Sequence, residues 1–277
     1  MENAPCLSNK SMVLKKCKHG YMLFNKNDNF ISKSLDKYGE WCEGELNLIG
    51  QILKPGMLVL DIGANIGTHS VFFAQKVLPG GGVLAIEPQR FVFQNLCANL
   101  SLNCITNVDC RRIAIGDNIG RIKVPVLDWN AEQNFGAVSL ENQLSGEPIK
   151  LITIDSLKLS KCDFIKIDVE GMESAVLKGA KETISKFKPI IYMENNREDK
   201  SKEIIEELFN IDYNLYWHFC PYYNKDNFFE NKENVFENIN PEVNILCLPK
   251  NIKLNTDMPE VLGPDDTFIA AFERMKK

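Results

Sequence analysis

The segment 59–70, VLDIGANIGTHS, decides the fold of this chain. An apolar run ends in Asp61, Gly63 and Gly67 bracket a tight turn, and a helix-like stretch begins at Thr68. Glycine tolerates positive φ and lets a ligand or another backbone approach closely. A strand, a glycine turn and a helix in this order are typical of nucleotide-binding α/β domains, so we expect a ligand at this turn.

The spacing of the glycines narrows the class of ligand. The turn reads G-A-N-I-G, which is not the dinucleotide fingerprint, and no Lys-Ser/Thr pair follows to cradle a phosphate. Asp61 would repel a pyrophosphate and suits a cationic amine. Glu87 ends the next strand-like run, twenty residues beyond Gly67, and can accept two hydrogen bonds from a ribose diol. Either acid alone is ordinary at a strand end, but together with the glycines they favour an adenosine that carries an amino acid.

Composition and charge exclude several other classes of protein. The chain has 277 residues, 44% of them hydrophobic, and a net charge of -5, which argues against a nucleic-acid or anionic-lipid partner. No apolar run is as long as a membrane span, and the first ten residues lack the apolar core of a signal peptide. Nine scattered cysteines without a CxxC pair favour a cytoplasmic setting.

Strand-like and helix-like runs alternate through the middle of the chain. This pattern predicts a parallel sheet with helices on both faces. We expect strands at 57–61, 82–87, 107–115, 162–168 and 189–195, and helices over 38–53, 68–78 and 172–187. Residues 213–219 and 244–249 read as two further strands, and a long polar and aromatic loop separates them.

Several of these stretches together resemble the FkbM-type methyltransferases. They are VLDIGANIGTHSVFFA, IEP with FVFQNLCANL, RRIAIGD, and KIDVEGMESAVLKGA followed by IIYMEN, and KIDVEGME is the most specific of them. The resemblance implies a Rossmann-like class I methyltransferase fold, α/β, with a seven-stranded, mostly parallel sheet and an antiparallel last strand. It also implies S-adenosylmethionine as cofactor and O-methylation of a sugar, a glycan or a small natural product.

The resemblance covers about residues 38 to 249 and suggests a division of the chain. We expect a cofactor-binding domain at 57–249, with an insert at 116–157 and a lid-like loop at 220–241. Residues 1–56 would form a hairpin and helix extension over the acceptor, and 250–277 a C-terminal extension of unassigned role.

The resemblance also suggests which residues hold the cofactor. Asp61 and Gly63 would lie near its methionine moiety, Glu87 would hold the ribose, and the stretch from Ala114 to Asp117 would lie near the adenine. Asp117 fits equally well as a turn residue in GDNIG. The full expected set is Tyr38, Asp61, Gly63, Ala64, Asn65, Gly67, Thr68, Glu87, Pro88, Ala114, Asp117 and Asp168.

Acidic residues at two later strand ends are the candidates for chemistry. Asp168, Glu170 and Glu194 follow strands whose carboxyl ends should share one crevice with the cofactor. A carboxylate can take the proton of an acceptor hydroxyl. Alternatively, Asp168, Glu194 and Asn195 offer three oxygen ligands for Mg²⁺. We favour the direct base over the metal.

The irregular regions are expected to bind the acceptor, a small molecule or glycan. Aromatic and amide side chains suit stacking on sugars, although the same residues can simply staple the loop to the domain. The expected acceptor-side residues are Trp41, Asn195, Tyr222, Tyr223, Asn224 and Asn227. Two other functions stay open at this point: a Rossmann-type oxidoreductase and a non-catalytic cofactor-binding scaffold. The sequence leaves the oligomeric state open.

Overall fold

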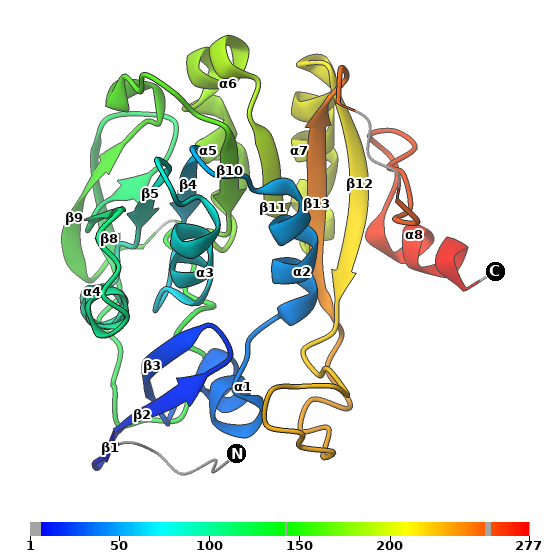
Figure 1. Ribbon diagram of the computed structural model, residues 1–277. Helices are drawn as coiled ribbons and strands as arrows, with labels where there is room; N and C mark the ends of the chain where they lie inside the picture. Colours follow the sequence, from blue (N-terminus) through cyan, green and yellow to red (C-terminus); the bar gives the residue numbers. More distant parts are fainter. Residues whose placement is uncertain (1–6, 142, 253–255, 277) are drawn as a thin grey trace.

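A seven-stranded sheet forms the centre of the molecule in the computed structural model, which describes residues 7–141, 143–252 and 256–276 (Figure 1). The strand order is β12-β13-β11-β10-β4-β5-β6. The strands are β4 (Leu58–Ile62), β5 (Gly82–Ile86), β6 (Val108–Arg111), β10 (Phe164–Ile167), β11 (Ile190–Glu194), β12 (Tyr213–Cys220) and β13 (Glu242–Pro249). All neighbouring pairs are parallel except those of β13, which is antiparallel to both β11 and β12. The expected class I methyltransferase fold is confirmed.

Helices cover both faces of this sheet, and each face has its own apolar core. Val59 of β4 packs on the side of α2–α4, whereas Leu60 and Ile62 pack on the side of α5–α7. Burial on both faces explains why the strands read as continuous apolar runs. The helices are α2 (Glu43–Ile52), α3 (Thr68–Lys76), α4 (Arg90–Leu102), α5 (Glu173–Lys178), α6 (Lys181–Phe187) and α7 (Glu198–Asn210).

The strand expected over 107–115 is wrong in its extent. It is divided between β6 in the main sheet and β7 (Ala114–Ile115) in a second sheet of order β7-β9-β8. The chain leaves the main sheet at Arg112 and Ile113, and Arg112 binds Glu147 of β9 with 2.5 Å between Nη2 and Oε2. The insert therefore builds a small sheet, with β8 (Gly120–Val124) and β9 (Glu147–Ile152), beside the main one.

Two helices also differ from the expected ranges. The helix expected over 38–53 begins only at Glu43. Tyr38 is instead the last residue of a separate helix, α1 (Ile31–Tyr38), which ends at Gly39 with a left-handed φ of 69°. The helix expected over 172–187 is broken into α5 and α6 at Gly179, where a Cβ would lie 2.0 Å from the carbonyl oxygen of Gly116. The carbonyl oxygen of Gly179 accepts from the backbone N–H of Asp155 in the insert (2.9 Å), so it is not bonded to the next helical turn and α5 ends there.

The N-terminal segment lies at the carboxyl end of the main sheet (Figure 1). It contains a three-stranded sheet of β1 (Leu7–Ser8), β2 (Met12–Cys17) and β3 (Gly20–Asn25), followed by α1. The segment 221–241 packs on α1, because the Tyr38 hydroxyl donates to the carbonyl oxygen of Glu233 (3.0 Å) and accepts from the amide of Val235 (2.8 Å). These two segments form one cap beside the strand ends.

The last helix, α8 (Phe268–Met275), packs outside the edge strand β12. The rings of Phe219 and Phe272 lie 5.2 Å apart, and the indole of Trp217 donates to Asp266. Of the extension 250–277, residues 253–255 and 277 lie outside the described part of the chain. In the described ranges, no helix combines the length and apolarity that crossing a membrane requires.

Candidate active site

A cleft opens at the carboxyl ends of β4, β5, β10 and β11. The strand-end acids Glu87, Asp168 and Glu194 line it. It has two connected parts, one acidic and one apolar. Both parts share the walls Gly63, Glu87, Gln89, Gly136, Asp168 and Glu170. Such a crevice at the carboxyl ends of parallel strands is where open α/β sheets bind ligands.

The apolar part is a narrow slot lined on both sides by aliphatic groups. Its walls include Pro88, Ala114, Val138, Leu140 and Met172. Residues 136–140 of the insert roof it, and the side-chain amide of Gln89 fixes the roof by donating to the carbonyl oxygen of Phe135 at 2.9 Å. A flat, weakly polar ring fits such a slot.

The acidic part is lined by six carboxyl groups: Glu45, Glu87, Asp168, Glu170, Glu194 and Glu242. Trp41, His69 and Asn244 are among its other walls. Like charges that share one cleft raise the free energy of each ionised carboxylate. The site therefore favours a bound cation or protonation of some of these carboxyl groups.

The glycine turn is shaped by packing as well as by access to the cleft. Gly63 has φ +81°, and a Cβ there would lie 1.7 Å from the backbone oxygen of Asp168. Gly67 has φ +88°, and its Cβ would meet Leu96 of α4 at 2.6 Å. Gly63 requires glycine because the backbone of Asp168 fills the space, and it also lines both parts of the cleft. Gly67 requires glycine because of its left-handed φ, since the end of the Leu96 side chain could move aside.

Glu87 lies where the two parts of the cleft join. Its carboxylate accepts the backbone N–H of Asn65 (3.1 Å) and of Gln89 (2.8 Å), which fix its direction. Burial raises the pKa of Glu87 to about 7, although these two bonds oppose the shift and the charges of Asp168 and Asp61 add to it. Each carboxylate oxygen keeps a lone pair for a further donor.

A buried lysine connects the acids of two strands. Lys166 in β10 lies with Nζ 3.0 Å from Oδ2 of Asp168 and 3.9 Å from Oδ1 of Asp61. Asp61 is fully buried, and its Oδ2 accepts from Ser70, whereas Oδ1 has no hydrogen-bond partner in the described part of the chain. Burial lowers the pKa of Lys166, but Asp168 and Asp61 outweigh it and raise the pKa, so this lysine stays charged.

Three carboxyl groups converge at the ends of β10 and β11. Oxygens of Asp168, Glu170 and Glu194 lie within 4.8 Å of one another. Burial and the charge of Asp168 raise the pKa of Glu170 to about 7. Burial, followed by the charges of Asp168 and Glu170, raises the pKa of Glu194 well above its ordinary range. Glu170 and Glu194 therefore hold their protons more tightly than ordinary glutamates do.

The expected acceptor and metal residue Asn195 is buried and is not among the walls of either part of the cleft. Its side-chain nitrogen donates to Ser201 Oγ at 2.8 Å, whereas its side-chain oxygen has no hydrogen-bond partner in the described part of the chain. Glu170 lies beside Asp168 and Glu194 as a further carboxyl group at these strand ends.

Most of the other expected residues either line the cleft or shape its turn. Trp41, Asn65, Pro88 and Ala114 line it. Ala64, Gly67 and Thr68 belong to the turn and the start of α3 without lining the cleft. Asp117 is exposed and accepts from Asn118, as its alternative role as a turn residue suggests.

The expected residues of the lid-like loop, together with Tyr38, hold the cap together. The Tyr223 hydroxyl donates to the carbonyl oxygen of Lys232, the Asn224 amide donates to Glu40, and the Asn227 amide bonds within the loop. Tyr222 packs on Trp41 with 5.3 Å between ring centroids and donates to Glu242. None of these five residues is among the walls of either part of the cleft.

Several cleft residues escaped the sequence reasoning. Glu45 and Glu242 come from α2 and β13, and Asn134 and Gly136 from the insert. Lys166, which lies behind the cleft acids, could have been noticed in the sequence, because it is a lone charge in the apolar run FIKI. All four residues of that strand are buried. The others have no such local signal, because distant segments bring them to the cleft.

The fold and the cleft first define the class: a Rossmann-like α/β domain of the class I methyltransferase type with an acidic cleft at the carboxyl ends of its strands. The family model described as "Methyltransferase FkbM domain" matches residues 61–215, more than half of the chain. The chain therefore belongs to the FkbM methyltransferase domain family, as the sequence motifs suggested.

Curated relatives are methyltransferases of different kinds. One is Methyltransferase sdnD of Sordaria araneosa, 27% identical over 47% of this chain and 62% of the relative. Another is Ribosomal RNA large subunit methyltransferase E of Oleidesulfovibrio alaskensis, 38% identical over 27% of this chain and 34% of the relative. The chain spans less than two thirds of the length of either protein.

Among solved structures, Methyltransferase FkbM from Methylobacillus flagellatus is similar in fold. It has a TM-score of 0.46 and 20% sequence identity, over 69% of this chain and 43% of that chain.

Proposed function

We propose that this protein is an S-adenosylmethionine-dependent methyltransferase that methylates a hydroxyl oxygen of a small molecule or glycan. The observation that carries the proposal is the position of Glu87 between an apolar slot and a cluster of carboxyl groups. An adenosine suits the slot and its ribose suits Glu87, while a sulfonium cation suits the carboxyl cluster. Family membership supports the same cofactor.

The residues present fit the cofactor in three respects. The unpartnered Oδ1 of buried Asp61 is a free acceptor beside the glycine turn. Glu87 keeps acceptor capacity for a ribose diol. The apolar walls Pro88, Ala114 and Met172 suit an adenine. When bound, S-adenosylmethionine supplies an activated methyl group with its own leaving group.

The protein would then orient the acceptor and remove its proton. We assign the proton to the cluster of Asp168, Glu170 and Glu194, whose oxygens lie within 4.8 Å of one another. A base works best when its pKa lies near the working pH. The pKa of Glu170, about 7, meets that condition. Lys166 stays charged and holds Asp168 in place, so it acts as a positioning residue. A divalent cation at the same carboxylates is the alternative that we do not favour.

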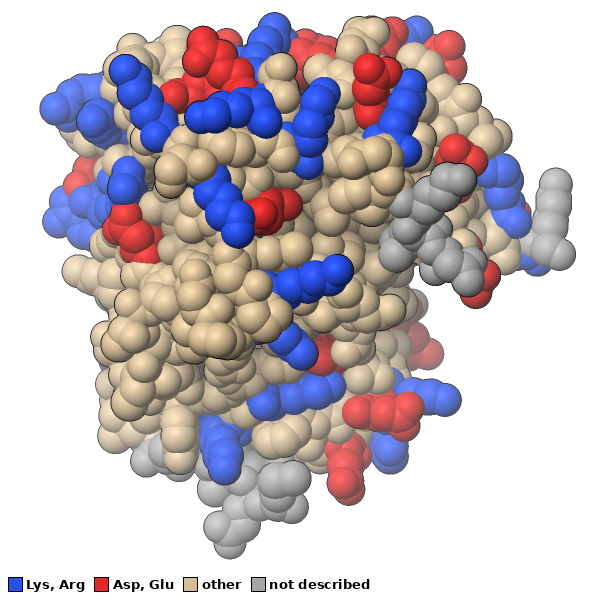
Figure 2. Space-filling model, turned by 45° about the horizontal axis from the view of Figure 1, so that its top comes forward, with Lys and Arg blue, Asp and Glu red and all other residues tan. Residues whose placement is uncertain are grey.

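Surface charge supports a neutral acceptor over a nucleic acid. The net charge is -5, and the face in Figure 2 carries Lys and Arg side chains interspersed with Asp and Glu. The cleft itself is strongly acidic, which disfavours a phosphate backbone. Trp41 at the wall of the acidic part offers an aromatic surface for a sugar or ring.

Calorimetry on the purified protein tests the cofactor first. We expect binding of S-adenosylmethionine and S-adenosylhomocysteine and none of reduced nicotinamide dinucleotide; no heat with either nucleoside would refute the proposal. Transfer of a labelled methyl group to sugars, natural-product alcohols and RNA then tests the acceptor. Labelled RNA alone would contradict the hydroxyl assignment, and nucleoside binding without transfer to any of them would favour a cofactor-binding scaffold.

A further inference from the structure

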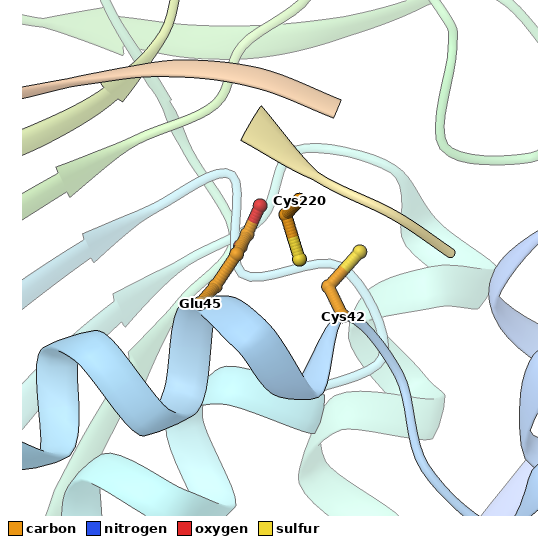
Figure 3. Close-up of side chains that lie close together, drawn as sticks. All are labelled: Cys42, Glu45 and Cys220. Atoms are coloured by element: carbon orange, nitrogen blue, oxygen red, sulfur yellow. The ribbon is translucent and has the colours of Figure 1, made fainter. Parts of the chain in front are cut away.

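Two cysteines and a glutamate that methyl transfer does not use meet at the edge of the acidic part of the cleft (Figure 3). Cys42 precedes α2, Glu45 lies in its first turn, and Cys220 is the last residue of β12. One ligand atom from each lies within 4.8 Å of the other two, and all three residues are buried. Segments 178 positions apart in the sequence (Cys220 minus Cys42) thus bring two thiols together beside a carboxylate.

The neighbourhood is arranged around these groups. Gly44 leaves room for sulfur, since a Cβ there would lie 3.0 Å from Cys220 Sγ. Cys42 has φ +42°, a left-handed conformation that is rare outside glycine and that tends to persist at functional positions. The Cys220 thiol makes a weak contact of 3.8 Å with the carbonyl oxygen of Pro221.

Glu45 is held as an oriented carboxylate. Its Oε1 accepts from the Asn244 amide at 2.8 Å, and its Oε2 lies 2.9 Å from Nε2 of His69. Partners of this kind fix the direction of a metal ligand. Burial raises the pKa of Glu45, but the bond to His69 and the charges of His69, Lys166 and His218 together outweigh burial and keep the pKa below its ordinary value.

We propose that Cys42, Cys220 and Glu45 bind a divalent cation of the zinc class. Two thiolates and one carboxylate are a donor set that zinc accepts, whereas Mg²⁺ and Ca²⁺ prefer oxygen alone. Neighbouring ligand atoms of a tetrahedral zinc are roughly 3.5–3.8 Å apart. The three ligand atoms here, which lie within 4.8 Å of one another, would need to move by about 1 Å through side-chain rotation to reach that spacing. Binding forms two metal–sulfur bonds and one metal–oxygen bond and releases both thiol protons to solvent.

The fourth coordination position faces the cleft. Cys42 and Glu45 are walls of its acidic part, together with His69 and Asn244. Three protein ligands with one open position are typical of zinc sites that bind water or substrate, whereas structural sites use four protein ligands. The site is separate from the carboxyl cluster of Asp168, and it stands whether or not the protein transfers methyl groups.

Cobalt titration of the full-length protein tests the site. Reduced, chelator-treated protein is titrated with Co²⁺ without oxygen. We expect one equivalent to produce thiolate-to-metal charge-transfer absorption and the strong visible bands of tetrahedral cobalt, and one equivalent of Zn²⁺ to abolish both. The variants Cys42→Ser and Cys220→Ser should lose these bands.

Glu45→Gln is the second variant, in case a cysteine variant fails to fold. It keeps both sulfur ligands, and we expect affinity for Zn²⁺ to fall at least tenfold. Cys110→Ser is the matched control, because Cys110 also contacts a second thiol, Cys97. It should leave the cobalt spectrum unchanged. Circular dichroism confirms that each variant is folded.

Three results would overturn the proposal. They are the absence of sulfur-to-cobalt absorption in reduced wild-type protein, an unchanged spectrum in folded Cys42→Ser protein, and a Cys42–Cys220 disulfide in the protein as purified under reducing conditions. Loss of nucleoside binding would leave the cobalt result intact, so failure of the proposed function is distinguishable from failure of this site.

Discussion

Lys166 Nζ donates a hydrogen bond to Asp168 Oδ2 across 3.0 Å, from inside a fully buried strand. The same ammonium lies 3.9 Å from Asp61. One buried cation therefore compensates acids at the ends of two neighbouring strands, β4 and β10. Removing one partner of a buried ion pair leaves an uncompensated charge.

Lys166→Met should destabilise the protein by roughly 3–5 kcal/mol, because Asp61 is left buried without a counter-charge. Urea unfolding followed by circular dichroism measures the change. Lys181→Met, at an exposed position of α6, is the control and should stay close to wild type. Equal midpoints for the two variants would show that Lys166 does not stabilise the pair of acids.

Glu87 should set the preference for a ribose diol. Wild-type protein should bind S-adenosylhomocysteine about 10- to 100-fold more tightly than its 2′,3′-dideoxy analogue, the range expected for hydrogen bonds to a charged acceptor. Glu87→Ala should weaken binding of the parent compound and remove the discrimination. Calorimetry with both ligands checks this, and discrimination that survived in the variant would assign the diol to another residue.

Asp168→Ala should keep the fold and lose most methyl transfer. Its side chain is 42% exposed at the strand end, so little packing is lost. Loss of a group at the reacting centre typically costs about 10²- to 10⁴-fold in rate. The rate of labelled methyl transfer and the melting temperature are measured together, with Asp212→Ala at an exposed turn as control. A wild-type rate would remove Asp168 from the chemistry.

The stability of the free protein should fall as pH rises toward neutrality. Glu87 and Glu170 have folded pKa values near 7 against an ordinary value of 4.5. Their folded forms bind protons more tightly, so the stabilisation is full below pH 4.5 and is lost between pH 4.5 and about 7. Each group contributes a slope of about 1.4 kcal/mol per pH unit in that window.

Chemical unfolding at several pH values measures this slope, and a ligand comparison identifies its cause. The cationic S-adenosylmethionine should flatten the fall more than the neutral S-adenosylhomocysteine, because its charge favours the ionised carboxylates. Glu170→Gln should lower the slope. A stability profile that rose over the same range would contradict the assigned directions.

Methyl transfer should not depend on added Mg²⁺. The expected ligand Asn195 donates to Ser201, and the carboxyl cluster can take the acceptor proton by itself. Rates are compared without Mg²⁺ and at saturating Mg²⁺, with Zn²⁺ content held constant. A strict requirement for Mg²⁺ would replace the carboxylate base by a cation that lowers the pKa of the acceptor.

The sequence predicted the sheet, most of its helices, and the acids Asp61 and Glu87 to which we assign the cofactor. The apolar run ending in Asp61 and the following glycines are local signals, and strand–helix alternation determines a parallel sheet because crossovers have one hand. Local patterns missed the break at Gly179, where the insert contacts the helix: the Gly116 carbonyl leaves no room for a Cβ, and the Gly179 carbonyl accepts from Asp155.

What the sequence alone determined, then, is the order of strands and helices and which acids follow the strands, since side-chain periodicity and chain chirality act over a few residues. Only the tertiary structure decided which side chains meet. Asn195 turns toward Ser201, Tyr38 binds the loop 221–241, and Cys42 reaches Cys220, because each direction is set by partners far along the chain. Contacts between distant segments, not local propensity, placed these groups.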